Sequence, residues 1–254
     1  MIAANLHLVS QRIQVACIAA GREPASIRLL AVSKMFGPEA VLEAAAAGQL
    51  EFGENYIAEG VEKIQALQKL YKLLPAGKAG QALQWHCIGP VQSNKTRLVA
   101  ENFDWVQTIE RLKIAQRLSD QRPAGLAPLQ VCLQVNIDGG ATKSGLAPGD
   151  AAALAAEVAR LPRLVLRGLM AIPEPSPDFA AACAVHAQMK SLFDAINAGG
   201  LLPVPMDTLS LGMSADLEAA VQAGSTMVRI GTAIFGSRSA DGTAAAPGQP
   251  AGAS

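Results

Sequence analysis

The sequence contains few charged residues, few aromatic residues and no excess of either charge. Only 17% of its 254 residues are charged, 4% are aromatic, and 21 Lys and Arg residues balance 21 Asp and Glu residues. A chain without net charge lacks the bulk attraction with which proteins bind duplex nucleic acid or anionic membranes. No apolar run reaches the roughly 18 residues of a transmembrane helix. We therefore expect neither a nucleic acid nor a membrane as a partner.

Cysteine is also scarce, and its spacing matches neither a C-x-x-C pair nor a metal site. The four cysteines are Cys17, Cys87, Cys132 and Cys183. Their mostly apolar surroundings favour buried free thiols over a disulfide framework. Reduced thiols are typical of the cytoplasm, and polar residues such as His7 and Arg12 interrupt any signal-peptide core near the N-terminus. The sequence predicts a cytoplasmic protein.

Eight short apolar runs, many of them rich in β-branched residues, alternate with alanine-rich stretches along nearly the whole chain. The predicted strands are 27–33, 50–53, 85–88, 105–108, 129–137, 164–171, 208–211 and 227–230. This alternation is typical of parallel β-α-β units, and strands without polar alternation are typical of sheets covered on both faces. Eight repeats in a chain near the ~250 residues of one (β/α)8 barrel favour a closed TIM barrel over an open doubly wound sheet.

Helical patterns and a change of composition define the domain organisation. Before the first strand, apolar residues recur at helical spacing and predict an extra amphipathic helix: Ile2, Leu6, Val9 and Ile13. Further predicted helices are 39–47, 150–160, 178–197 and 217–223. We expect one domain over 1–236, a surface loop at 75–80, and a disordered tail rich in Ala, Gly, Pro and Ser over 237–254.

Lys34 ends the first predicted strand, directly after the apolar run 29–33. Ligands of (β/α)8 barrels bind at the carboxyl ends of the strands, so we expect Lys34 at the barrel mouth. Apolar surroundings favour the neutral amine, which is the form that attacks an aldehyde. A lysine that ends a strand is more often a solvated surface charge, so the residue alone leaves both interpretations open.

The segments after the seventh and eighth strands predict a phosphate site. Arg229 would point into the mouth, Gly231 permits a close approach of the backbone, and Thr232 offers an N–H and a hydroxyl. Ser214, within 210–216, is a predicted N-cap beside N–H groups that suit an anion. Each residue also has a plain structural interpretation, as an ion pair, a turn or a cap. Their combination matches the usual phosphate position in such barrels.

Polar residues also follow the second strand, and others lie in and after the third. Asn55 is placed to hydrogen-bond a ligand, whereas Glu54 and Tyr56 could equally cap or pack the chain. His86 lies inside a predicted strand, where a buried core histidine is the more common interpretation. Lys95 is either a surface charge or a contact to a second ligand molecule, and the sequence leaves this open.

At these residues the sequence resembles the pyridoxal phosphate homeostasis proteins. The shared motifs are LLAVSK (29–34), FGENY (52–56), WHCIGPVQSNK (85–95), RLVLRGLMAI (163–172), DTLSLGMSADLEAA (207–220) and GSTMVRIGTAIFG (224–236). They follow the family's order over nearly the whole chain, and only the tail lies outside the resemblance. The resemblance implies a barrel similar to the N-terminal domain of alanine racemase.

The resemblance also implies a cofactor and its contacts. Pyridoxal 5′-phosphate (PLP) would form a Schiff base with Lys34, and Arg229 would face its pyridine nitrogen. The positions that match phosphate contacts are Ser214, Gly231 and Thr232, with Ser210 and Met213 nearby, and Asn55 matches a residue that lines the cofactor. The implied function is intracellular vitamin B6 homeostasis, in which the protein holds PLP and passes it on, with PLP-dependent apoenzymes as candidate recipients.

Two other functions remain as alternatives. The first is a PLP-dependent amino-acid racemase or a related barrel enzyme, which would need a second acid–base group over the cofactor, such as His86, Tyr56 or a cysteine. Arginine opposite the pyridine nitrogen disfavours its protonation and weakens the electron sink, which argues against this alternative. The second is a barrel for another phosphorylated metabolite, with Lys34 acting only as a charge. Without the dimer-forming second domain of alanine racemase, we expect a monomer.

Overall fold

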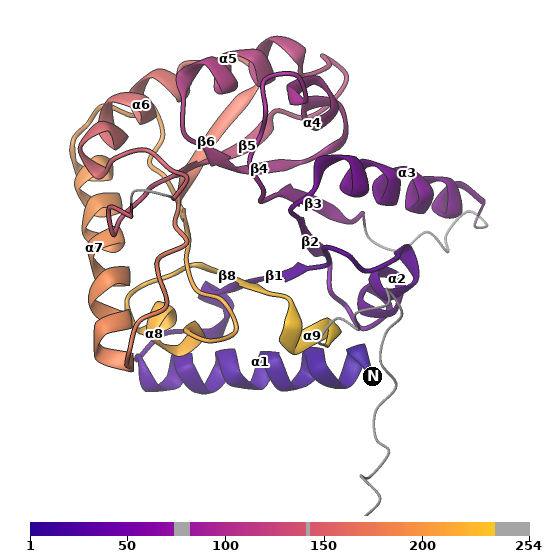
Figure 1. Ribbon diagram of the computed structural model, residues 1–254, viewed down its shortest axis with the longest axis horizontal. Helices are drawn as coiled ribbons and strands as arrows, with labels where there is room; N and C mark the ends of the chain where they lie inside the picture. The colour runs from indigo at the N-terminus through magenta and orange to yellow at the C-terminus, as the bar shows by residue number, and fades with distance from the viewer. Residues whose placement is uncertain (74–81, 141–142, 237–254) are drawn as a thin grey trace, which may run out of the picture.

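The computed structural model of the protein describes residues 1–73, 82–140 and 143–236. Within them, eight parallel strands close into a barrel in chain order, and helices surround it (Figure 1). The strands are β1 Arg28–Val32, β2 Glu51–Glu54, β3 Gln84–Cys87, β4 Trp105–Ile109, β5 Leu129–Gln134, β6 Leu164–Met170, β7 Thr208–Ser210 and β8 Met227–Ile230. The predicted TIM barrel is therefore confirmed. The predicted loop 75–80 and tail 237–254 lie outside the described residues.

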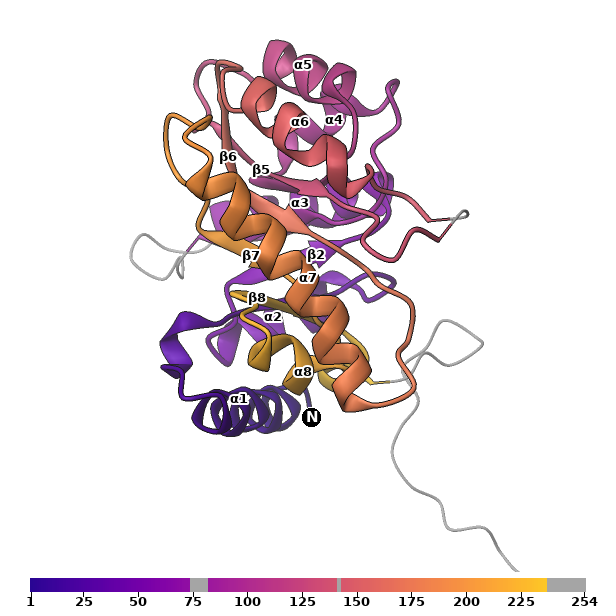
Figure 2. The ribbon, with the colours of Figure 1, turned by 90° about the vertical axis from the view of Figure 1, so that its left-hand side faces the viewer.

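The helices follow the strands, except for one that precedes the barrel. They are α1 Ile2–Ala19, α2 Pro38–Ala46, α3 Ile57–Leu73, α4 Thr96–Asn102, α5 Leu112–Gln121, α6 Ala151–Val158, α7 Phe179–Ala198, α8 Leu217–Gln222 and α9 Thr232–Phe235. The predicted extra helix is α1, which lies across the outside of α8 and α9 (Figures 1 and 2). In the described part of the chain, no helix combines the length and the apolar character that crossing a membrane requires.

The predicted strand 129–137 is too long at its end. The strand β5 stops at Gln134, because the backbone N–H of Asn136 donates to the carbonyl of Leu146 instead of continuing along β6. The predicted helix 150–160 also differs, since a 3-10 turn over Pro148–Asp150 precedes α6. Both differences fall at the ends of elements, where local turns compete with the regular pattern.

Apolar packing explains why these segments take their places. The predicted face of α1 is buried, with Val9 only 2% exposed, and it packs against α8, α9 and α2. The strands are buried on nearly every residue, as expected for a sheet covered by helices outside and by packed side chains inside. Three of the cysteines are buried, Cys183 is half-buried, and all four are free thiols as predicted.

Barrel closure positions the mouth residues. The strand β1 pairs with β2 on one side and with β8 on the other, so that Leu30 is the register partner of Arg229. The carboxyl ends of β1, β2 and β8 therefore open at the same end of the barrel. Lys34 and Thr232, which are far apart in the sequence, both lie at this end.

The contact between β6 and β7 depends on a glycine. A Cβ atom added at Gly168 would lie 1.5 Å from the carbonyl oxygen of Thr208, its register partner in β7. We expect Gly168→Ala to lower the free energy of unfolding by more than about 3 kcal/mol, because backbone rather than a flexible side chain must move. Urea unfolding monitored by circular dichroism measures this change.

Gly125→Ala is the matched control, since a Cβ atom there meets nothing within 4 Å. We expect its effect to stay within about 0.5 kcal/mol. Equal stability of the two variants would show that β6 and β7 tolerate a wider separation than the structure indicates.

Candidate functional site

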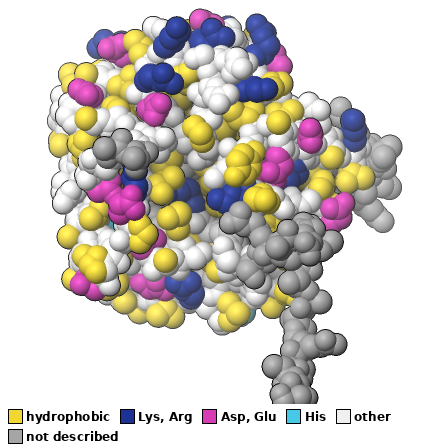
Figure 3. Space-filling view, in the orientation of Figure 1, with side chains coloured by type: hydrophobic (Ala, Val, Ile, Leu, Met, Phe, Trp, Pro, Cys, Tyr) yellow, Lys and Arg dark blue, Asp and Glu magenta, His cyan; other side chains and the backbone are white. Residues whose placement is uncertain are grey.

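A pocket of about 420 Å³ opens at the mouth of the barrel. It is lined by Val32, Lys34, Phe36, Asn55, Ile88, Ile172, Met213, Ser214, Ala215, Arg229, Gly231, Thr232 and Gly236. Figure 3 shows the face on which it opens, with Lys and Arg side chains near the centre among apolar and uncharged groups. All the predicted site residues except Ser210 line this pocket. The sequence did not single out the apolar members Val32, Phe36, Ile88 and Ile172, because an apolar residue at the end of a strand looks like core.

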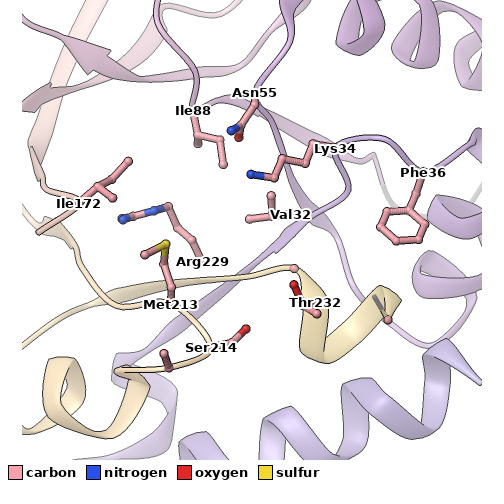
Figure 4. Close-up of a pocket in the computed structure, with 13 residues that line it drawn as sticks. Val32, Lys34, Phe36, Asn55, Ile88, Ile172, Met213, Ser214, Arg229 and Thr232 are labelled. Carbon is pink, nitrogen blue, oxygen red and sulfur yellow. The ribbon is translucent and has the colours of Figure 1, made fainter. Parts of the chain in front are cut away.

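Lys34 lies two residues beyond the end of β1 and is half-buried. Its amine points into the pocket between the apolar side chains of Val32 and Ile88 (Figure 4). Within the described residues, the Nζ atom of Lys34 forms neither a hydrogen bond nor an ion pair. Lys34 is therefore a half-buried amine in the wall of a partly apolar pocket, whereas the alternative interpretation was a solvated surface charge.

Arg229 comes from β8 and is buried, with 4% of its surface exposed. Its guanidinium donates to the carbonyls of Ser210 (2.7 Å) and Ala171 (2.8 Å) and to the Ser210 hydroxyl (2.7 Å). Burial lowers the pKa of Arg229 to about 10, although the negative charge of Asp216 opposes this shift. The side chain thus stays charged at neutral pH. Its guanidinium is hydrogen-bonded to carbonyl groups, whereas the structural interpretation of the sequence was an ion pair with a carboxylate.

Ser214, Gly231 and Thr232 lie at one end of the pocket, where Figure 4 labels Ser214 and Thr232. The first N–H groups of a helix have no acceptor within that helix, and Thr232 begins α9 after Gly231. A Cβ atom at Gly231 would lie 3.2 Å from the carbonyl oxygen of Val32, so a side chain there would crowd β1. This end of the pocket offers hydroxyl and backbone donors to an anion.

The predicted N-cap at Ser214 is wrong, because α8 begins at Leu217 and its N-cap is Asp216. The carboxylate of Asp216 instead accepts from the backbone N–H of Met213 (2.7 Å) and contacts Nε2 of His186 (2.9 Å). From the other side, Arg12 of α1 donates to the carbonyl of Ser214 (3.2 Å). The turn before α8 is therefore fixed at both ends by side chains, while the Ser214 side chain stays at the pocket.

Ser210 does not line the pocket, although it was a predicted site residue. It is fully buried beneath Arg229, and its hydroxyl donates to Oε1 of Gln107 (2.7 Å) while accepting from the Arg229 guanidinium. The amide nitrogen of Gln107 lies 2.9 Å from Nδ1 of His86. Since an amide nitrogen can only donate, Nδ1 accepts and the proton of the neutral imidazole lies on Nε2. A buried hydrogen-bonded chain therefore runs from His86 to Arg229.

His86 is the core histidine that its strand position favours. It is fully buried, stacks on Trp105 with ring centroids 4.9 Å apart, and does not line the pocket. Burial, and secondly the positive charge of Arg28, hold the pKa of His86 well below its usual value. Tyr56 is 56% exposed and also lies outside the pocket lining. Among the described lining residues, Lys34 and Arg229 are the titratable side chains.

Comparison with known proteins gives the class and then the family. Residues 6–239 match the family model "Alanine racemase, N-terminal domain". The pyridoxal phosphate homeostasis protein of Pseudomonas aeruginosa is 55% identical over 237 residues, which are 93% of this chain and 96% of that protein. The protein of the same name from Escherichia coli K12 is 55% identical over 238 residues, 93% and 97% of the two chains.

Among solved structures, PipY of Synechococcus elongatus with PLP bound has a TM-score of 0.76 and 33% identity, covering 93% of this chain and 100% of that one. The chain therefore belongs to the alanine racemase N-terminal domain family and, within it, to the pyridoxal phosphate homeostasis proteins.

The buried neutral His86 predicts a pH dependence of stability. Below about pH 6.5 the unfolded chain binds a proton at this histidine that the folded protein does not bind. The free energy of unfolding should therefore fall as the pH falls, by up to about 1.4 kcal/mol per pH unit from this group. In His86→Gln this contribution disappears, so urea unfolding at about pH 7 and about pH 5.5 should show a smaller loss than in the unmodified protein.

His7→Gln is the control, because His7 lies exposed on α1. It should keep the pH dependence of the unmodified protein. If His86→Gln and the unmodified protein lose the same stability over this range, His86 is not the buried neutral group that the structure indicates.

Proposed function

We propose that the protein binds PLP in this pocket and holds it reversibly as a Schiff base on Lys34, as part of vitamin B6 homeostasis. The observation that carries the proposal is the amine of Lys34, which points into the pocket and has no partner among the described residues. The names of the relatives and the PLP in the PipY structure support the same ligand. PLP is in this proposal a cargo that is bound and released.

The pocket residues fit the two ends of such a ligand. The hydroxyl and backbone donors of Ser214, Gly231 and Thr232 suit a phosphate, which carries about two negative charges at neutral pH. The guanidinium of Arg229 suits the pyridine nitrogen, and Asn55 offers an amide to the ring from the side of β2. Lys34 lies among these groups, where its amine would reach the aldehyde.

Reversible storage needs little chemistry from the protein. The neutral amine of Lys34 adds to the aldehyde carbon and water leaves, which forms the C=N bond. Water adds back to that bond and regenerates the amine and the free aldehyde. No oxidant, metal or second catalytic residue takes part in either direction. The site needs only to hold the phosphate and the ring while this exchange proceeds.

The position of Arg229 supports a carrier over the alternative, a PLP-dependent amino-acid racemase or a related enzyme. A permanent positive charge opposite the pyridine nitrogen keeps that nitrogen unprotonated, so a carbanion at the substrate would be stabilised less. The described pocket lining also holds no tyrosine, histidine or cysteine that could act on the face opposite Lys34. Both observations favour a site that binds PLP without activating an amino acid.

The other expectations from the sequence remain proposals. We propose a single ligand-binding domain over 1–236. We further propose that the protein is a monomer. We also propose that it is cytoplasmic, which the free thiols support. PLP-dependent apoenzymes are the proposed recipients of the cargo. Lys95 does not line the pocket, so a second PLP contact there would be a separate site.

Replacement of Lys34 tests the proposed function directly. The purified protein with PLP should show a visible Schiff-base absorbance band. Reduction with borohydride should leave the pyridoxyl group of PLP covalently attached, as a label, to the peptide that contains Lys34. Lys34→Ala should lose the band. An unmodified protein that shows no band, or that carries label spread over surface lysines, would favour another phosphorylated ligand, with Lys34 acting only as a charge.

Hydrogen exchange at the α-carbon separates the carrier from the enzyme. The PLP-loaded protein should exchange the α-hydrogen of alanine and other amino acids with deuterated water no faster than free PLP does. Nuclear magnetic resonance measures this exchange, with an alanine racemase as positive control. Exchange that is well above free PLP and depends on Lys34 would make the protein an enzyme.

A further inference from the structure

A buried ion pair lies behind Lys34, away from the pocket lining. Glu54 at the end of β2 is fully buried, and Lys63 on α3 is 5% exposed. The Nζ atom of Lys63 lies 2.7 Å from Oε1 of Glu54 and 3.3 Å from Oε1 of Glu59, one helical turn earlier. Neither member of the Glu54–Lys63 pair contributes to the pocket lining. Any effect of the pair on a ligand in the pocket is therefore transmitted through other residues.

The pair and Glu59 together hold the backbone on the two sides of Lys34. On one side, the ammonium of Lys63 donates to the carbonyl of Ser33 (2.8 Å), and the Ser33 hydroxyl donates to Glu54 (2.6 Å). On the other side, the N–H of Met35 donates to Glu59 (2.5 Å). Met35 has a φ of 65°, a left-handed conformation that costs energy in a residue with a side chain. These contacts fix the turn from which the Lys34 side chain projects.

The same strand end also carries two other pocket residues. Asn55 directly follows Glu54, and the carbonyl of Glu54 accepts from the N–H of Ile88 (2.9 Å). Lys34, Asn55 and Ile88 lie around one side of the pocket in Figure 4. Glu54 therefore lies beside the points at which the chain leaves β1, β2 and β3 toward these three lining residues.

Stability alone gives little reason for such a pair. Replacing a buried ion pair by apolar residues of similar volume is often neutral or stabilising, because the attraction barely repays the desolvation of two charges. Here the second carboxylate oxygen of Glu54 is buried and has no hydrogen-bond partner. Burial of the Glu54–Lys63 pair therefore costs free energy of folding. Both side chains of the pair are hydrogen-bonded to Ser33, the residue before Lys34.

We propose that Glu54 and Lys63 are positioning residues, which hold the turn at Lys34 so that its amine meets the aldehyde of PLP. The inference rests on the proposed function and adds the residues that make Lys34 effective. The amine has no partner of its own among the described residues, so its location depends on the backbone that carries it. Bond formation is sensitive to such placement, since a misplacement of about 1 Å can cost about 100-fold in rate.

The test compares two ligands that differ only at the reacting carbon. PLP has an aldehyde there, and pyridoxine 5′-phosphate has an alcohol that cannot form a Schiff base. In the double variant Glu54→Leu/Lys63→Met, which leaves no unpaired buried charge, we expect the dissociation constant for PLP to rise about tenfold or more. The dissociation constant for pyridoxine 5′-phosphate should stay within about twofold, because the phosphate and pyridine contacts remain.

The control is the double variant Arg28→Met/Glu51→Leu. It removes a different ion pair, with a 2.8 Å contact, which joins β1 to β2. This pair lies where the two strands begin, at the end of the barrel away from Lys34. Both dissociation constants should stay as in the unmodified protein. Equal weakening of the two ligands in Glu54→Leu/Lys63→Met would indicate general damage to the pocket and overturn the proposal. Unchanged affinity for PLP would overturn it as well.

Glu59→Ala provides a second variant, milder than the loss of the buried pair. Its side chain is 31% exposed, so its removal leaves the core intact, but it removes the carboxylate that accepts from the N–H of Met35. We expect about a threefold weaker affinity for PLP and no change for pyridoxine 5′-phosphate. If the unmodified protein forms no Schiff base, the proposed function itself fails. If it forms one and all these variants match it, the positioning role alone is wrong.

Discussion

The closure of the barrel between its first and last strands is the constraint on which the site depends. Parallel pairing of β1 with β8 places Leu30 beside Arg229, and pairing of β1 with β2 places Val32 beside Gly53. With these registers fixed, the chain leaves β1, β2 and β8 at one rim. The amine of Lys34 and the hydrogen-bond donors that follow β8 then line one pocket, although no hydrogen bond joins them within the described residues.

The pocket is supported from below and from behind by polar groups that a ligand would not touch. Below it, Ser210 and Gln107 hold the guanidinium of Arg229 through the barrel interior. Behind it, Glu54 and Lys63 hold the turn at Lys34. Buried polar groups of this kind are tolerated where nearly every donor and acceptor is satisfied, and they then fix one geometry. The pocket thus offers free donors to a ligand, while most of the polar groups that support it are hydrogen-bonded to one another.

The sequence predicted the fold well because its signals were local. Apolar runs of strand length and alanine-rich helices identify eight β-α units, and the chain length favours a single barrel. The same logic placed Lys34 and Arg229 at the mouth. It could not place Ser210, because the face of a strand residue depends on register, and it wrongly made Ser214 an N-cap. It gave no sign of Lys63, since a lysine on a helix of mixed polarity looks solvated until β1 and β2 are placed beneath it.

The position of α1 has a consequence for the synthesis of the protein. Its apolar face packs on α8 and α9, and Asn5 donates to the carbonyl of Ile234, so its partners are among the last described elements of the chain. A ribosome that adds about 5–20 residues per second needs on the order of 10–40 s to supply them. During that time the part of this face that packs on α8 and α9 has no native partner, although α2 is already present. Among the described helices, α1 is therefore separated from its main partners by the longest stretch of chain, and its exposed apolar face is a binding site for a chaperone during synthesis.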